Sequence, residues 1–285
     1  MNICPVNFSG NISDKSKKIE NNKELIRSVI GKEYAVAKEV EDLSGFASIK
    51  EVFKPFPSHY GAFEGDSNTG LAVCKNYTHH IGLNYDDDKN ISQIRVYDTK
   101  RKDVGIYDEN GNMLRHYSPE ESLALMKYKH DSKNFHKVMR YNEPVKNEEE
   151  VKKDIETISN LFKFNYKTNK AEEDFVTYRA LDSKALKEIM EMPEDGMIYT
   201  EPSILSVATN KKSVLQFMNP KNCRHILRLK VKEGARFINL DEASAGRIIY
   251  PQMPENELIF KPGSKILITN RHADGGFIDA ELIEG

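Results

Sequence analysis

The chain has 285 residues, with 42 Lys and Arg against 44 Asp and Glu, which gives a formal net charge of −2. This length suits one large domain or two modest ones that bury a core without staples, and the near-neutral balance excludes a global basic field for nucleic acid or an anionic membrane. Three widely separated cysteines, Cys4, Cys74 and Cys223, match neither a zinc spacing nor a disulfide framework, which indicates a reducing compartment.

Residues 1–22 are rich in Asn, Ser and Lys and contain few apolar positions. This composition is typical of a flexible arm, because too little apolar surface is available to offset the entropy of ordering. The stretch lacks the continuous apolar run of a secretory signal, and no later segment is apolar enough over 18 or so residues to span a bilayer. We therefore expect a polar leader without a cleavable signal, and no stable membrane insertion.

Residues 23–145 predict a mixed α+β region of unknown role, which would localise the protein or recognise a target. A turn of Asp and Asn-Gly character at 108–112 separates two of its expected strands. Ser118, Pro119 and Glu121 form a capping box with proline at the first helical position, so a helix should begin there. The strands of this region are predicted over 94–97, 104–107 and 113–115.

A histidine pair in this half, His79 and His80, is followed by three aspartates at 86–88. These are metal-ligand types, but their spacing does not define a coordination shell. We interpret the stretch as a polar loop and predict that the protein needs no metal ion.

The charge run 146–150 is the expected boundary of a new unit that extends to residue 285. Asn147 can cap a helix with Glu150 reaching back, and apolar residues then recur on one helical face at Val151, Ile155, Ile158 and Phe162. Further helices are predicted at 183–190 and at 211–218, the second capped by Asn210. Strands are predicted at 175–179, 204–207, 226–231, 236–238, 257–260, 265–269 and 277–283. The fold class is therefore α+β.

The run Pro254-Glu255-Asn256-Glu257-Leu258-Ile259-Phe260 places two glutamates one residue apart at the mouth of an apolar strand. Because strand side chains alternate between faces, Glu255 and Glu257 should project the same way, where each makes the other costlier to ionise. An isolated pair of this kind is by default a solvated strand edge. Its meaning depends on the partners that lie upstream.

Two upstream segments supply such partners. Arg179 lies near the end of the strand Thr177-Tyr178-Arg179-Ala180-Leu181, directly before a helix, and Ser206 lies in the strand that begins after Glu201-Pro202-Ser203. Together with the glutamate pair, these segments resemble the arginine–serine–glutamate class of mono-ADP-ribosyltransferases, a group that includes many bacterial toxins and injected effectors. The resemblance covers roughly residues 150–285. It departs from the family pattern at Val207 and Ala208, where a threonine and a second serine are usual.

The resemblance implies a fold of two small packed sheets with flanking helices, and NAD as the substrate. Arg179 would grip the pyrophosphate of NAD through charge-assisted hydrogen bonds. Glu257 would stabilise the positive, oxocarbenium-like ribose that forms when nicotinamide leaves, and Ser206 would orient that glutamate. Further NAD-binding residues implied by the match are Ala180, Asn210 and Phe217.

Glu255 would pair with an arginine acceptor and take its proton as the new bond forms. In the loop upstream, Tyr250 and Gln252 stand where the family recognises its target protein, and an exposed aromatic there can anchor an interface. We therefore expect a monomeric, NAD-dependent protein mono-ADP-ribosyltransferase that favours arginine. The resemblance also suggests an effector or toxin secreted by a bacterium without a cleavable signal and acting on a host protein in the host cytosol.

Three alternatives remain open. The acceptor can be Thr, Asn or Gln instead of arginine, in which case the role of Glu255 changes. The enzyme can be an NAD glycohydrolase in which water accepts the ribose. Because Val207 and Ala208 depart from the family pattern, the chain can also be a catalytically silent module that keeps the fold for partner binding.

Overall fold

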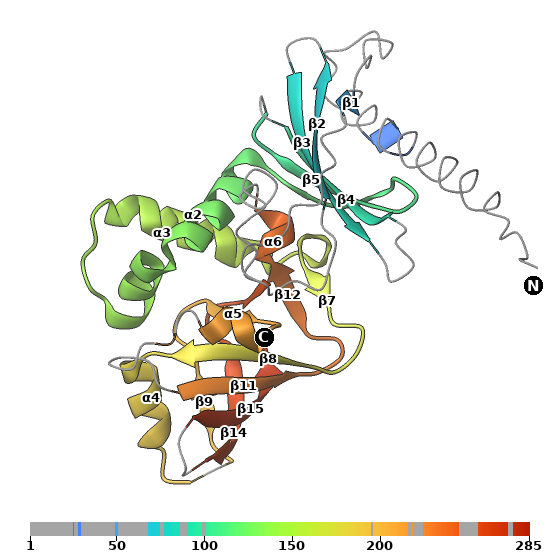
Figure 1. Ribbon diagram of the computed structural model, residues 1–285. Coiled ribbons are helices and arrows are strands. Elements are labelled where there is room, and N and C mark those ends of the chain that lie inside the picture. The colour runs from blue at the N-terminus through green and yellow to red at the C-terminus, as the bar shows by residue number, and fades with distance from the viewer. Residues whose placement is uncertain are drawn as a thin grey trace, which may run out of the picture.

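A computed structural model describes residues 25, 28–29, 49–50, 68–74, 77–85, 91–98, 101–194, 196–215, 218, 225–244, 256–272 and 276–285. Figure 1 shows a six-stranded sheet of N-terminal strands at the top, a group of helices at the left, and the C-terminal strands below. The α+β class predicted from the sequence is confirmed.

The N-terminal sheet is an antiparallel meander in which every strand pairs with the next one in the chain. The predicted turn forms as expected, because the Asp108 carboxylate accepts the N–H groups of Asn110 (2.9 Å) and Asn112 (2.7 Å). His79 and His80 lie within a strand, so their assignment to a polar loop was wrong, while residues 86–88 lie outside the described residues. The strands are β1 (Ile49–Lys50), β2 (Asn68–Cys74), β3 (Tyr77–Tyr85), β4 (Ile91–Asp98), β5 (Val104–Asp108) and β6 (Met113–Tyr117).

The longest described helix, α2, begins with the predicted capping box: Ser118 N–H donates to Glu121 Oε2 (2.7 Å), and Glu121 N–H donates to Ser118 Oγ (3.3 Å). The helix is kinked at Asp131, whose φ and ψ of −143° and 52° are not helical. A π-helical turn, Lys137–Tyr141, continues it. Helix α2 spans Pro119–His136, and further helices in the described residues are α3 (Glu148–Leu161), α4 (Ser183–Met190), α5 (Lys211–Leu215), α6 (Leu240–Ala243) and a 3₁₀ turn (Asn165–Lys167).

Helix α3 starts where the sequence predicts it, but the predicted cap at Asn147 was wrong. Asn147 is left-handed, with φ of 60°, and its side chain makes no capping hydrogen bond. Its carbonyl instead accepts the N–H groups of Glu150 (3.0 Å) and Val151 (3.1 Å). The Glu150 carboxylate does not reach back either, because it accepts a hydrogen bond from Lys127 of α2 (2.5 Å).

The C-terminal strands are hydrogen-bonded in the order β7-β12-β13-β10-β8-β11-β15-β14-β9. Strands β10 and β8 share one residue pair, Ala208 opposite Tyr178, so the order divides there into parts of four and five strands, in keeping with the expected pair of small sheets. The pair β11–β15 is parallel and the other pairings are antiparallel. The strands are β7 (Asn169–Lys170), β8 (Phe175–Leu181), β9 (Ile198–Thr200), β10 (Leu205–Ala208), β11 (His225–Val231), β12 (Arg236–Asn239), β13 (Glu257–Phe260), β14 (Lys265–Arg271) and β15 (Phe277–Glu284).

Strands β10 and β13 bury side chains on both faces. Val207 and Phe260 belong to a core cluster with the neighbouring strands, while Ile259 belongs to a second cluster that includes Tyr128 of α2 and Ile158 of α3. Each fully buried apolar side chain of this kind contributes roughly 1.5–3 kcal/mol. The second cluster contains residues from both sides of position 146, and the division into units 23–145 and 146–285 remains a prediction.

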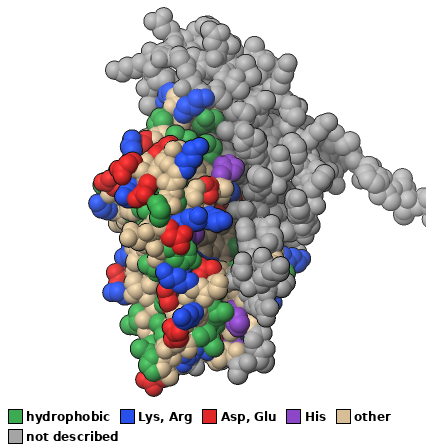
Figure 2. Space-filling model, turned by 90° about the vertical axis from the view of Figure 1, so that its left-hand side faces the viewer, with side chains coloured by type: hydrophobic (Ala, Val, Ile, Leu, Met, Phe, Trp, Pro, Cys, Tyr) green, Lys and Arg blue, Asp and Glu red, His purple; other side chains and the backbone are tan. Residues whose placement is uncertain are grey.

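On the face turned to the viewer in Figure 2, acidic and basic side chains of the described residues are interspersed. This distribution accords with the net charge of −2. Of the helices in the described part of the chain, none is long and apolar enough to cross a membrane.

Candidate active site

A pocket of about 370 Å³ lies beside the junction of the two sheet parts, next to the Ala208–Tyr178 pair. Antiparallel strands that share one residue pair diverge beyond it, and this divergence leaves room between β8 and β10. The wall opposite is formed by α2, which belongs to the half of the chain whose role the sequence left unassigned. Side chains that face the pocket include Lys129 and His136 of α2, Arg179 and Ala180 of β8, Ser206 of β10 and Glu257 of β13.

Ser206 and Glu257 are brought together by the register of β10 and β13. Ala208 lies opposite Glu257 and Ser206 lies opposite Ile259, so Ser206 is the diagonal neighbour of Glu257 on one face of the strands. The Ser206 hydroxyl donates a hydrogen bond to Glu257 Oε1. Glu257 is only 9% exposed, which makes this hydrogen bond an important determinant of its rotamer.

Tyr128 of α2 lies close enough to Glu257, Arg179 and Glu201 for their charges to act on its hydroxyl. Tyr128 is fully buried. Burial raises the pKa of Tyr128 far above its ordinary value, and the nearby Glu257 charge raises it further. The phenol of Tyr128 therefore stays protonated and neutral beside Glu257.

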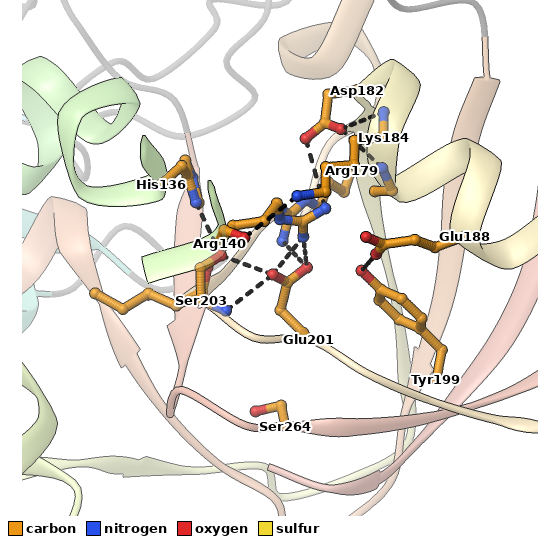
Figure 3. Close-up of polar contacts among 12 residues, drawn as sticks. His136, Arg140, Arg179, Asp182, Lys184, Glu188, Tyr199, Glu201, Ser203 and Ser264 are labelled. Carbon is orange, nitrogen blue, oxygen red and sulfur yellow. Dashed lines mark hydrogen bonds and ion pairs between the residues drawn. The ribbon is translucent and has the colours of Figure 1, made fainter. Parts of the chain in front are cut away.

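Arg179 is held from behind by a buried carboxylate. Its Nη1 lies 3.2 Å from Glu201 Oε2, and both oxygens of Glu201 also accept hydrogen bonds from Nη2 of Arg140, in the π-helical turn after α2. Glu201 is 2% exposed. Figure 3 shows the Glu201 carboxylate facing the guanidinium groups of both Arg140 and Arg179, so that one carboxylate orients both cations.

The charge on Glu201 is maintained despite its burial. Burial acts to raise the pKa of Glu201, but the charges of Arg179 and Arg140 and a hydrogen bond from Ser203 outweigh it and leave that pKa below its ordinary value. The Ser203 hydroxyl donates to Glu201 Oε1 at 2.6 Å, and the Ser203 N–H donates to the same oxygen at 3.1 Å. The Glu201 carboxylate thus interacts with three residues: Arg179, Arg140 and Ser203.

His136 extends this network to the pocket wall. Its Nδ1 lies 2.9 Å from Ser203 Oγ. Because that hydroxyl donates its proton to Glu201, Nδ1 of His136 must be the donor, which assigns the neutral tautomer with Nε2 as an acceptor. Burial, followed by the charge of Arg179, lowers the pKa of His136 to about 4. The imidazole is therefore neutral at physiological pH.

Asp182 links the end of β8 to α4. Its carboxylate caps the helix by accepting the N–H groups of Lys184 (2.9 Å) and Ala185 (2.8 Å), and it lies 3.6 Å from Nη1 of Arg140. Burial acts to raise the pKa of Asp182, but the Ala185 N–H and the two arginines lower it below its ordinary value. Asp182 thus fixes the chain just after Arg179 to the start of α4 and to Arg140.

The pocket collects some of the residues that the sequence predicted, namely Arg179, Ala180, Ser206 and Glu257. Asn210 does not line it; this side chain caps α5 by accepting the N–H of Lys212 at 2.8 Å. The other predicted site residues lie outside the described residues: Phe217, Tyr250, Gln252 and Glu255.

Asn256 changes the geometric argument for the glutamate pair. Its φ of 50° is left-handed, and β13 begins only at Glu257. The alternation of side chains along a strand therefore cannot be extended from Glu257 back to Glu255.

Sequence reasoning missed four polar residues at or behind the pocket. Arg140 and Glu201 meet across 61 positions in the sequence, and no local pattern indicates that pairing. The others, Lys129 and His136, lie on a helix that the resemblance did not cover. One available signal was Glu201 itself, an acidic residue four positions before the strand that carries Ser206. In the described part of the chain, no three His, Cys, Asp or Glu side chains gather to hold a metal ion.

No protein-family model matches the chain, and no curated protein matches it. Similar solved structures include Plx2a, an ADP-ribosyltransferase toxin from Paenibacillus larvae, at 18% identity and a TM-score of 0.44, covering 59% of this chain and 88% of that one. Another is the Clostridium limosum C3 exoenzyme, at 16% identity and a TM-score of 0.42, covering 58% and 86%. A third is the Vis toxin, an ADP-ribosyltransferase from Vibrio splendidus, at 16% and 0.39, covering 59% and 75%. With TM-scores below 0.5, these similarities carry no weight for function, which has to be judged from the site itself.

Proposed function

We propose that this protein is an NAD-dependent mono-ADP-ribosyltransferase that transfers ADP-ribose from NAD to a side chain of another protein, with arginine favoured, and releases nicotinamide. One observation carries the proposal: the serine-bound Glu257 and the carboxylate-anchored Arg179 line the same pocket. The three sequence motifs support the same assignment of roles.

Arg179 would bind the pyrophosphate of NAD. Glu201 holds its Nη1 from behind, at 3.2 Å, and an anchored guanidinium can direct its other N–H groups at phosphate oxygens with little loss of side-chain entropy. Ala180 beside it is small enough to let a dinucleotide approach the strand. Val214 of α5 also lines the pocket, so α5 would border the bound NAD; the NAD-binding roles of Asn210 and Phe217 are proposed from the sequence motif alone.

Glu257 would act on the ribose that carries nicotinamide. As the bond to nicotinamide breaks, positive charge develops on the sugar, and a carboxylate in a largely buried position stabilises that charge more strongly than water would. The hydrogen bond from Ser206 supports the ionised form of Glu257 and limits its rotamers.

The acceptor side of the reaction is assigned from the sequence motifs. Glu255 would pair with the guanidinium of a target arginine and remove its proton, and Tyr250 with Gln252 would contact the target protein. The proposal includes action as a bacterial effector or toxin in a host cytosol, as the family resemblance implies.

The test is incubation of the wild type and Glu257→Ala with labelled NAD and a eukaryotic lysate. The wild type should label one or a few proteins on arginine, as identified by mass spectrometry, and Glu257→Ala should label none. Glu281→Ala is the matched control, because Glu281 lies on β15 and makes an exposed ion pair with Lys232; it should label like the wild type.

Each alternative predicts a different outcome. Nicotinamide release without labelled protein would indicate a glycohydrolase. Label on Thr, Asn or Gln would keep the transferase but refute the role of Glu255. No nicotinamide release with any lysate would refute the enzyme altogether.

A further inference from the structure

Asn256, the residue directly before Glu257, is held at both of its main-chain polar groups. Its carbonyl accepts the N–H of Thr209 at 3.0 Å, and its own N–H donates to Oδ2 of Asp241 at 2.9 Å. Its left-handed φ of 50° is a conformation that asparagine tolerates better than most residues. Because β13 begins at the next residue, these two hydrogen bonds fix the backbone from which Glu257 projects.

Asp241 is itself fixed by segments that are distant in the sequence. It is 2% exposed, and its Oδ1 accepts a hydrogen bond from Lys129 of α2, 112 positions away. Its main-chain carbonyl accepts Nη1 of Arg95 on β4 at 2.7 Å, and its N–H donates to Asn239 at 3.0 Å. The two oxygens of one buried carboxylate thus bind Lys129 of α2 and the main-chain amide of Asn256.

We propose that Asp241 is a positioning residue for the transfer reaction. It orients Glu257 by holding the amide of Asn256, and Lys129 supplies the counter-charge that allows a carboxylate to do so in a buried place. This proposal rests on the transferase function proposed above.

A hydrogen bond to an ionised carboxylate is about twice as strong as one between neutral groups. A buried carboxylate is also costly without a paired cation, which accounts for Lys129 at this position. An ion pair that only stabilises the fold could lie anywhere along α2. Asp241, the partner of Lys129, also binds the main-chain amide of Asn256, between Glu255 and Glu257. In addition, Lys129 and Glu257 line the same pocket. Loss of Asp241 should therefore reduce the rate of the chemical step as well as stability.

The experiment compares Asp241→Asn with Asp154→Asn. Asp154 is a matched control, because it is 8% exposed and pairs with another lysine of α2, Lys127, at 2.9 Å, whereas Asp241 binds the amide of Asn256 as well as its lysine. Nicotinamide release from NAD gives kcat and KM for NAD, and urea unfolding reports the stability of each variant. If Asp241→Asn does not fold, Lys129→Met tests the same link.

We expect Asp241→Asn to lower kcat about tenfold to a hundredfold, the range of one charge-assisted hydrogen bond, with KM for NAD within about twofold of wild type. Asp154→Asn should lower stability but leave kcat unchanged. The positioning role is overturned if Asp241→Asn keeps the wild-type kcat, if only KM rises, or if Asp154→Asn loses as much kcat. Absence of turnover by the wild type itself would instead refute the proposed function.

Discussion

The Ser206 hydroxyl donates a hydrogen bond to Oε1 of Glu257 across the antiparallel strands β10 and β13. The register places the two residues diagonally on one face, and a strand pair holds such neighbours more rigidly than a loop would. The serine thus lies where it can fix the orientation of Glu257, the carboxylate proposed to act on the ribose, without itself reacting.

Replacement of Ser206 by alanine should lower kcat for nicotinamide release by about tenfold to a hundredfold, which corresponds to the loss of a hydrogen bond worth roughly 1–3 kcal/mol. KM for NAD should change little, because Arg179 is untouched. Ser159→Ala is the control: that hydroxyl donates to the Ile155 carbonyl within α3, at 2.7 Å, and its removal should leave kcat unchanged. An unchanged kcat in Ser206→Ala would contradict the orienting role.

Glu201→Gln should destabilise the protein strongly. The substitution leaves the guanidinium of Arg140, whose side chain is 1% exposed, beside a neutral group. Removing the charge of one partner of a buried ion pair lowers the free energy of unfolding by about 3–5 kcal/mol. Asp279→Asn removes one carboxylate charge from a comparable pair with Arg228 at 2.7 Å, but that arginine is 46% exposed, so the loss should stay below about 1 kcal/mol. Urea unfolding measures both, and equal losses would refute the structural weight given to Glu201.

Because of His136, the free energy of unfolding should decrease as the pH is lowered through a defined window. Its pKa is about 4 in the folded protein, lowered by burial and then by Arg179, against 6.5 ordinarily. Between these values the unfolded chain takes up a proton that the folded protein refuses, so stability is complete above pH 6.5 and declines as pH falls to about 4. The full effect is about 3 kcal/mol.

The measurement for His136 is the free energy of unfolding in urea at several pH values, for the wild type and for His136→Gln. The variant should lose much of the slope between pH 4 and 6.5. Glu201, whose pKa is lowered, contributes stability that is lost only as pH falls below its ordinary 4.5, so the two effects separate. A variant with an unchanged slope would show that His136 is not the group responsible.

Much of the fold could be predicted because its signals are local. The capping box at Ser118 depends on residues three positions apart, and a short apolar run indicates the strand that carries Ser206. The cap at Asn147 failed for a non-local reason: Glu150 is engaged by Lys127 of α2. Similarly, a histidine pair in a polar context gave no sign that it lies in a strand.

The site was predicted in part for the same reason. Arg179, Ser206 and Glu257 are recognisable because each lies on its own strand in a characteristic order. Glu201 and Arg140 are not, because a buried ion pair across 61 positions leaves no spacing pattern in one sequence. The contribution of α2 to the pocket could not be predicted either, since helix packing depends on the tertiary arrangement of side chains that are individually ordinary.

The most direct test of the central claim is nicotinamide release from NAD by the purified protein. It is measured for the wild type and for Glu257→Gln under conditions in which both proteins are fully folded. The carboxamide keeps the size of the side chain and its hydrogen bond from Ser206, but it loses the charge that stabilises the developing positive ribose. Turnover by the wild type with a loss of about 10²-fold or more in the variant, the size expected when a group that stabilises transition-state charge is removed, is the predicted result. Equal rates in the two proteins, or no release by the wild type with an acceptor lysate present, would contradict it.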